Sequence, residues 1–387
     1  MDEQTRVAII GGGPVGLFLG LQLRAAGVEC LVLERRCDSH AHSRAIGIHP
    51  PALELLQGLG VAESLLARGR QVRRGHAFLG STLAGTLSFE RCPPPFRFVL
   101  SIPQEVTERV LEERLRVLGP DALHRGWEVL AVENGAPGGV ELLVERVGGE
   151  RGRVRADLAV GCDGRDSLVR RGAGIPFAGD SYDDPFVMGD FEDTTAFGDD
   201  AALFLHPDGV LESFPLPGGR RRWVARVTRL VDGDLRTQLA SLVAERAEHP
   251  ALLDAACFMT SHFRAQRFLA KTLVHGRLAL AGDAAHVVSP IGGQGMNLGW
   301  LNAALLGRTL ISLLKAPGGI DLRALSAAYS APARRRARRV ARRAAFNTLM
   351  ASRWRHPTPR DALVRLLLRT PLRELAARVF TMRGLGA

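Results

Sequence analysis

Residues 6–16 of the chain read Arg-Val-Ala-Ile-Ile-Gly-Gly-Gly-Pro-Val-Gly. The apolar run predicts a buried strand, and a helical pattern follows the glycines over residues 17–26. Residues 29–34, Glu-Cys-Leu-Val-Leu-Glu, predict a second strand that ends in an acid. Strand, Gly-x-Gly-x-x-Gly, helix, strand and acid form, in this order, the dinucleotide-binding fingerprint in its full context. The stretch therefore predicts an α/β fold of Rossmann type.

The three glycines of the fingerprint have separate roles. Gly11 makes the tight turn, Gly13 lets a pyrophosphate approach the backbone, and Gly16 permits close packing of helix on strand. Pro14 and Val15 stand at the helix start, where proline is well tolerated, and are assigned to the same site.

The acid that ends the second strand is Glu34, which lies 18 residues after the last glycine of the fingerprint. At this position a carboxylate accepts hydrogen bonds from the hydroxyl groups of an adenosine ribose. Arg35 follows directly in the chain, and we assign it to the same binding site.

A second glycine-rich junction lies far along the chain. Residues 278–281 form an apolar run of strand type, Gly282 breaks it, and Asp283 places an acid at its carboxyl end. Residues 290–297 read Pro-Ile-Gly-Gly-Gln-Gly-Met-Asn, and the pattern is helical after Gly295. Backbone without Cβ atoms lets a flat ligand approach, and a helix start favours a negative charge. The junction therefore predicts a site for a flat, anionic ligand.

Three further stretches carry polar residues at junctions between predicted elements. Residues 157–160 predict a strand that runs into Gly-Cys-Asp-Gly, so that Asp163 lies at another strand-to-turn junction. Gln104 immediately precedes a predicted amphipathic helix over residues 105–118. The guanidinium of Arg44 either reaches a phosphate or lies on the surface.

Between these elements the sequence pattern predicts short, alternating strands. We expect antiparallel strands at 190–191, 201–205, 209–214 and 222–226, and a helix over 235–246. The predicted organisation is a discontinuous nucleotide-binding domain (1–75, 100–182 and 265–350), an inserted β-sheet domain (76–99 and 183–264) and a helical tail (351–387). Leucines at helical spacing in the tail are expected to pack on the core.

Composition narrows the class of protein. The chain has 387 residues, a net charge of +11 carried mainly by arginine, and five scattered cysteines without metal-ligand spacing. We expect a cytoplasmic protein, because the first residues are no signal peptide and no apolar run is long enough to span a bilayer. The arginines of 334–343 spread around a helix and come with no nucleic-acid-binding motif, so we expect neither a nucleic-acid partner nor stable membrane insertion.

The histidines His40, His42 and His49 do not complete a metal site, because no cysteine or carboxylate spacing accompanies them, and no metal is predicted. Oligomeric state is left as monomer or homodimer.

Taken together, the fingerprint with Glu34, the Cys162-Asp163-Gly164 turn and the Gly282-Asp283 junction resemble one family. They are similar to the single-component, class A flavoprotein monooxygenases of the p-hydroxybenzoate hydroxylase type, above all the hydroxylases of phenol degradation and aromatic polyketide tailoring. The resemblance implies a glutathione-reductase-type FAD-binding domain, an inserted substrate-binding sheet and C-terminal helices.

The resemblance also implies a role for each matching residue. Glu34 would hold the adenosine ribose, Arg44 and Gln104 would contact FAD, and Asp163 would serve FAD and the nicotinamide cofactor. Gly282 and Asp283 would bind the diphosphate–ribityl region. The residues implied at the flavin ring are Pro290, Gly292, Gly293, Gly295, Met296 and Asn297.

The activity implied is hydroxylation of a phenolic, quinone or polyketide-like molecule. NADPH or NADH would reduce FAD, and O2 would then form a C4a-hydroperoxyflavin that attacks the aromatic ring. An FAD-dependent oxidase or dehydrogenase, a Baeyer–Villiger or epoxidising enzyme, and a non-catalytic flavoprotein remain alternatives. His76, His206 and Arg220 lie in the expected substrate block, but the sequence singles out none of them as a general base.

The chain departs from the family pattern in two places. Asn302-Ala303 stands where relatives commonly have an acid followed by alanine, which leaves that helix contact open. Many relatives in phenol degradation add a thioredoxin-like domain, which we do not expect within these residues. The Trp-x-Trp-x-Ile-Pro signature of flavin halogenases is missing, which disfavours halogenation.

Overall fold

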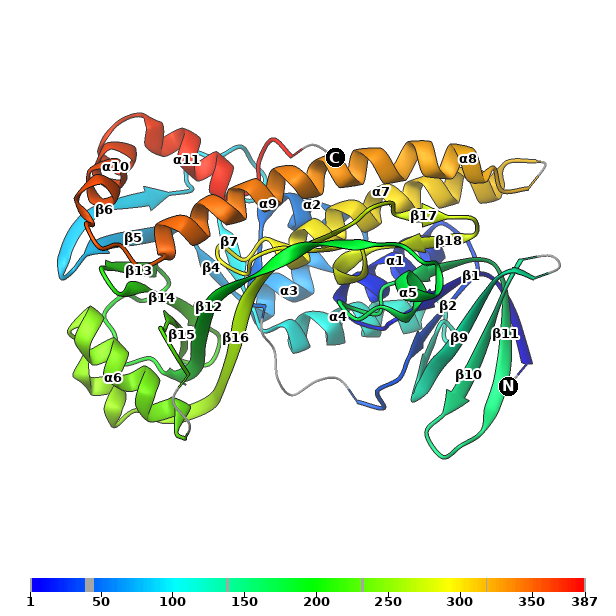
Figure 1. The fold of residues 1–387 in the computed structure, drawn as a ribbon, viewed down its shortest axis with the longest axis horizontal. Coiled ribbons are helices and arrows are strands. Elements are labelled where there is room, and N and C mark those ends of the chain that lie inside the picture. Colours follow the sequence, from blue (N-terminus) through cyan, green and yellow to red (C-terminus); the bar gives the residue numbers. More distant parts are fainter. Residues whose placement is uncertain (1, 39–44, 137–138, 231–232, 318, 386–387) are drawn as a thin grey trace.

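The computed structural model describes residues 2–38, 45–136, 139–230, 233–317 and 319–385 (Figure 1). The strands are β1 (Asp2–Ile10), β2 (Cys30–Glu34), β3 (Gly47–Ile48), β4 (Arg70–Val72), β5 (Arg74–Leu79), β6 (Thr82–Ser88), β7 (Val99–Ser101), β8 (Leu123–Arg125), β9 (Trp127–Ala136), β10 (Gly139–Arg146), β11 (Arg151–Gly161), β12 (Phe177–Glu192), β13 (Ala201–His206), β14 (Gly209–Leu216), β15 (Arg220–Arg226), β16 (Cys257–Ala270), β17 (Val274–His275), β18 (Leu278–Leu280) and β19 (His286–Val287). The α-helices are α1 (Pro14–Ala25), α2 (Pro50–Gly58), α3 (Ala62–Arg68), α4 (Gln104–Leu118), α5 (Leu168–Gly172), α6 (Leu235–Ala247), α7 (Gly295–Lys315), α8 (Leu322–Leu325), α9 (Ala331–Ala351), α10 (Thr358–Arg369) and α11 (Leu372–Phe380). Short 3₁₀ turns η1 (Pro250–Leu253) and η2 (Gly282–Ala284) and a π-helical turn η3 (Ser326–Ser330) complete them.

The first sheet carries the fingerprint. Its order is β17-β18-β11-β1-β2-β8, and the strands from β18 to β8 pair in parallel. Ile10 pairs with both Leu33 and Gly161, and Gly161 pairs with Leu280, so that four strands end side by side. The turns that follow these strands therefore meet at one edge, which is the usual place for a ligand in a parallel sheet. The predicted α/β class is confirmed.

The second sheet has the order β19-β16-β12-β15-β14-β13-β5-β6. Strand β5 pairs in parallel with β13 and brings the segment around residue 78 beside strands that follow residue 200. The long strands β12 and β16 pair from Phe177 with Ala270 to Phe191 with Cys257. In Figure 1 they run from the second sheet toward the helices of the first, and α6 covers the outer side of the second sheet.

The C-terminal segment forms α10 and α11, with Pro371 between them. The expectation that its leucines pack on the core is wrong for Leu366, Leu372 and Leu375, whose exposed fractions are 53%, 44% and 60%. These two helices lie against β6 at one end of the second sheet, so only part of each is covered (Figure 1). Beyond α11 the chain is anchored instead by Leu385, which is buried in a cluster with residues of α7 and α9.

The arginine-rich segment is α9, and its side chains divide between interior and surface. Arg336 is buried and donates to the carbonyl of Leu301 and to the side chain of Asn302. The exposed members of the run lie three or four positions apart and share one face: Arg335, Arg338, Arg339 and Arg342. Throughout the described residues, helices fall short of the length and apolar content that crossing a membrane requires.

Candidate functional site

The turn after β1 packs without room for side chains. Gly11 has φ of +105°, which glycine adopts readily, and a Cβ there would lie 2.4 Å from the carbonyl oxygen of Cys162. A Cβ on Gly16 would lie 1.9 Å from the carbonyl oxygen of Gly11. At Gly13, by contrast, an added Cβ would meet no atom within 4 Å. The turn is therefore closely packed at Gly11 and Gly16 and open at Gly13, as binding of a pyrophosphate requires.

Glu34 lies at the predicted place, at the end of β2, and it is buried. Its carboxylate accepts from the N–H of Gly12 at 2.7 Å and from Nε of Arg36 at 2.9 Å. Arg35, in contrast, lies exposed and faces Glu128 at 3.8 Å. The structure thus brings Arg36, which we did not predict at this site, to the carboxylate, and the assignment of Arg35 to the cofactor site stays a prediction. Two consecutive arginines in sequence gave no signal to choose between them.

Gln104 begins α4 beside this cluster. Its side-chain amide donates to Glu108 at 2.8 Å, one helical turn further along. Burial raises the pKa of Glu108, and the guanidinium groups of Arg36 and Arg125 oppose that rise. Buried acids and arginines therefore surround the end of β2, which suits a ribose with several hydroxyl groups.

Asp163 follows β11 at the same edge of the sheet. One carboxylate oxygen accepts from the N–H groups of Leu168 at 2.7 Å and Val169 at 3.2 Å, and so caps α5. The other oxygen is buried with no hydrogen-bond partner within the described part of the chain. An orphaned acceptor is costly unless a ligand satisfies it. This position fits the predicted contact with a cofactor.

Asp283 lies in the turn after β18. Its side chain is exposed to solvent, yet the surrounding protein raises its pKa to about 6 by burial. Gly282 before it packs against Val15, because a Cβ there would come within 3.3 Å of that side chain. Asp283 therefore lies next to the start of α1.

Helix α7 begins close by and is fixed to α1. The indole N–H of Trp300 donates to the carbonyl of Pro14 at 2.9 Å, and a Cβ on Gly299 would lie 2.6 Å from Val15. Met296, in the first turn, packs against the main core. Neither α1 nor α7 has a side-chain cap or an acid in its first turn. Two helix starts with free N–H groups and positive potential therefore face one region.

The side chain of Asn297 is fully engaged by protein. It accepts from the N–H of His49 at 2.8 Å and donates to the carbonyls of Gly47 and Gly293 at 2.9 Å. His49 Nε2 donates in turn to the carbonyl of Gly292 at 3.1 Å, and burial lowers the pKa of His49 to about 4. The side chain of Asn297 thus holds the glycine loop in shape. The predicted contact of Asn297 with a flavin would therefore be made by its backbone.

The predicted residues of the glycine loop lie at the surface of this region. Pro290 and Gly293 are exposed, and Gly292 and Gly295 are partly exposed. All four residues are accessible to a flat ligand, and their position suits contact with one edge of its ring system. Arg44 falls outside the described residues, as do His40 and His42.

None of the three side chains considered as a base is placed at this loop. His76 is held by Thr86 and Asp200 at 3.0 and 3.1 Å, and Arg220 stacks over the ring of Phe258. His206 alternates with Leu205, and Leu205 packs in the cluster that contains Ile291 of the loop. His206 therefore points to the opposite face of the sheet.

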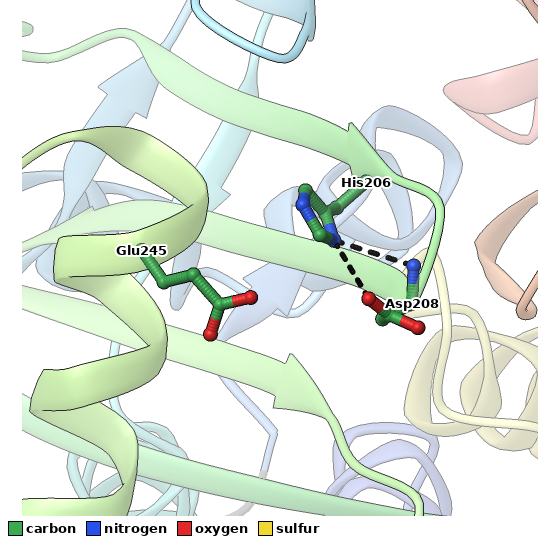
Figure 2. A group of neighbouring side chains, drawn as sticks. All are labelled: His206, Asp208 and Glu245. Atoms are coloured by element: carbon green, nitrogen blue, oxygen red, sulfur yellow. Dashed lines mark hydrogen bonds and ion pairs between the residues drawn. The ribbon is translucent and has the colours of Figure 1, made fainter.

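On that opposite face, His206, Asp208 and Glu245 gather within 4.8 Å of one another (Figure 2). Figure 2 shows Glu245 reaching from α6 toward the end of β13. Arg353 lies 3.2 Å from Asp208, and burial, followed by the charge of Arg246, lowers the pKa of His206. Since guanidinium groups already balance the acids, the arrangement disfavours a cation, and we assign no metal to it.

A family model described as an FAD binding domain matches residues 4–344. The "uncharacterized aromatic compound monooxygenase YhjG" of Bacillus subtilis (strain 168) is 35% identical over 81% of this chain and 63% of its own length. A rifampicin monooxygenase of Streptomyces venezuelae is 32% identical over 78% of this chain and 63% of its own. A dialkyldecalin synthase of Streptomyces rugosporus is 34% identical over 77% of this chain and 65% of its own.

Among solved structures, p-nitrophenol 4-monooxygenase PnpA of Pseudomonas putida DLL-E4 has a TM-score of 0.88, covering 99% of this chain and 98% of its own. At 22% identity this likeness concerns the fold. The chain spans about 63% of the length of the two monooxygenases that it matches in sequence. The match over residues 4–344 and the shared fold confirm the resemblance, and the chain belongs to the FAD-binding family of class A, p-hydroxybenzoate hydroxylase-like flavoproteins.

Proposed function

We propose that the protein is an NAD(P)H- and FAD-dependent monooxygenase that hydroxylates an aromatic small molecule of phenolic, quinone or polyketide type. The observation that carries the proposal is the meeting of two uncapped helix starts, at α1 and α7, with the orphaned oxygen of Asp163 and with Asp283, whose pKa is raised by burial. A site for a dinucleotide alone uses the first of these elements. The names of the relatives, which include monooxygenases of an aromatic compound and of rifampicin, support the reaction class.

Each part of the site has a task toward FAD. The start of α1 would hold the diphosphate, Glu34 the ribose, and the start of α7 the negative charge of the reduced ring. Bound FAD would supply electron transfer from NAD(P)H and oxygen activation, through the C4a-hydroperoxide that the family resemblance implies. The second sheet would cover the substrate and keep water out.

The proposal is tested with purified protein, FAD and NADPH or NADH under heavy-isotope oxygen, with a panel of phenols, quinones and polycyclic polyketides. We expect one heavy oxygen atom per product molecule, measured by mass spectrometry. Substrate turnover without incorporated label would contradict oxygen insertion. If the reduced nicotinamide is consumed and only hydrogen peroxide forms with every member of the panel, that result would count against these three substrate classes.

Three other functions fit the same cofactor site. An FAD-dependent oxidase or dehydrogenase would convert substrate without labelled oxygen. The relationship to a dialkyldecalin synthase favours a second candidate, a synthase that keeps the cofactor fold for another reaction. Baeyer–Villiger or epoxidation chemistry would incorporate label but place it in a ring ester or an oxirane, which fragmentation of the product distinguishes.

A further inference from the structure

The second sheet presents one face to α6 and the other to the cofactor site. Leu211 and Trp223 pack with residues of α6 on the first face. Val210 and Val224 lie on the second face, in a cluster with Ile291 of the glycine loop before α7. Because side chains alternate along a strand, the residues of β14 that share a face with Val210 also point toward the cofactor side.

Glu212 is one of these residues. Its neighbours across the ladder are Leu203 of β13 and Val224 of β15, both apolar. Three positions further along β14, the carbonyl of Pro215 accepts from the hydroxyl of Ser101 in β7 at 2.6 Å. Glu212 therefore lies on the covered side of the sheet, between the contact with the glycine loop and the contact with β7.

Glu212 is 8% exposed, and its carboxyl makes no side-chain hydrogen bond or ion pair with any residue that the structure describes. Burial is the cause that raises its pKa, to about 7. Neither of its oxygens belongs to the fully enclosed atoms that lack a partner, so the carboxyl keeps a small contact with solvent. On the same face Asp190 is paired with Arg222 at 2.6 and 2.7 Å, whereas Glu212 is not.

A buried carboxyl with apolar flanks and no protein partner is unfavourable for folding alone. Its surroundings suit a ligand that fills the apolar space with an aromatic ring and offers one hydrogen-bond donor. A base that titrates near neutral pH is also well matched to removing a proton from a phenol, which makes the ring carbons more nucleophilic.

We propose that Glu212 binds the phenolic hydroxyl of the substrate and accepts its proton. This inference rests on the proposed function for the identity of the ring. In the step, the O–H bond of the phenol breaks, its electron pair stays on oxygen as phenolate, and a new O–H bond forms on the Glu212 carboxylate. The proton returns to water after the product leaves, so the step needs no further reactant.

The test measures binding to the FAD-loaded protein rather than turnover. The probes are 1-naphthol and 4-phenylphenol, each compared with its methyl ether, by equilibrium dialysis from pH 5.5 to 8.5. We expect the wild type to prefer each phenol by about 10-fold or more at high pH, because the charged carboxylate is a much stronger hydrogen-bond acceptor than the protonated acid. The preference should grow as pH rises through about 7. In Glu212→Gln it should be small and independent of pH.

Glu245→Gln is the matched control, since Glu245 is an exposed carboxyl on α6, on the other side of the sheet. It should behave as the wild type. A wild type that binds neither phenol, or binds phenols and ethers alike, would overturn the proposal. So would a pH-dependent preference that survives in Glu212→Gln or is lost in Glu245→Gln.

Stability separates a binding role from a structural one. The folded-state pKa of Glu212 is raised above the usual glutamate value, so its charged form opposes folding, and stability is lost as pH rises from about 4.5 to about 7. Glu212→Gln and Glu212→Leu should therefore melt no lower than the wild type at pH 8 and retain FAD. Collapse of both variants would show that Glu212 holds the fold. If the binding preference follows Glu212 but no labelled oxygen enters any product, the monooxygenase proposal fails and the binding role stands.

Discussion

The carboxyl groups at this site differ in their hydrogen-bond partners. The carboxylate of Glu34 accepts hydrogen bonds from Gly12 and Arg36, and one carboxylate oxygen of Asp163 caps α5. Asp283 makes no side-chain hydrogen bond or ion pair to another described residue, and it follows Gly282, which packs against α1 and α7. Its position rather than its protein contacts therefore points to a ligand.

We predict that Asp283→Ala lowers the affinity for FAD by roughly 10- to 100-fold, the range for losing a hydrogen bond to a charged group. Folding should be unaffected, because the side chain supports no neighbour. Flavin fluorescence on titration of the apoprotein measures the affinity, with Asp166→Ala, an exposed acid near the α5 turn, as the control. Unchanged FAD affinity in Asp283→Ala would rule out this role.

At the scale of elements, the strand–turn–helix units follow from sequence because glycines and apolar runs act locally. The β1 turn, the helix at α4, the helix at α6 and the hairpin between β14 and β15 all appear where they were predicted. Two glycines of the fingerprint, the open Gly13 and the closely packed Gly16, allow the ligand and the backbone to be tested separately.

Gly16→Ala should destabilise the protein by about 3 kcal/mol, because its Cβ would overlap the carbonyl of Gly11, which is backbone and cannot rotate away. Gly13→Ala should fold normally, because the space there is empty and φ is −76°. It should nevertheless bind FAD roughly tenfold more weakly, since the methyl group occupies the approach to the backbone. Thermal melts of the apoproteins and FAD titrations check both. Equal behaviour of the two variants would contradict the separation.

What sequence could not supply is the orientation of a side chain across distant elements. The pattern of residues 209–214 predicts a strand, but nothing local says which face α6 covers, so Glu212 passed unnoticed. The choice between Arg35 and Arg36 depends on the turn after β2. Likewise, the arginine run gave no hint that Arg336 points inward to Asn302, a contact made only when α7 and α9 pack together.

At the scale of the whole molecule, the last described residues join parts that are distant in sequence. Arg383 pairs with Glu54 of α2 and donates to the carbonyls of Pro93 at 2.9 Å and Phe96 at 3.2 Å. Phe380, before it, meets the ring of His49 edge-on at 5.7 Å between centroids. The chain end therefore supports the residues that hold the glycine loop.

We predict that Arg383→Ala lowers the free energy of unfolding by about 2–3 kcal/mol, because two carbonyls lose their donor and Glu54 loses its partner. Arg373→Ala, an exposed position on α11, should change it by less than about 0.5 kcal/mol. Urea unfolding of both variants measures the difference. An equal effect of the two substitutions would mean that the tail is not anchored through Arg383.

The pairing of β12 with β16 bears on how the molecule moves. A hinge works where a few residues absorb a rotation, and the register between these two strands shifts between Ser181 and Pro185 and again between Asp190 and Phe191. We therefore expect the second sheet to rotate relative to the first about the interruption at Ser181–Pro185, on the microsecond-to-millisecond timescale of domain motions. On this view the substrate enters when the two sheets swing apart.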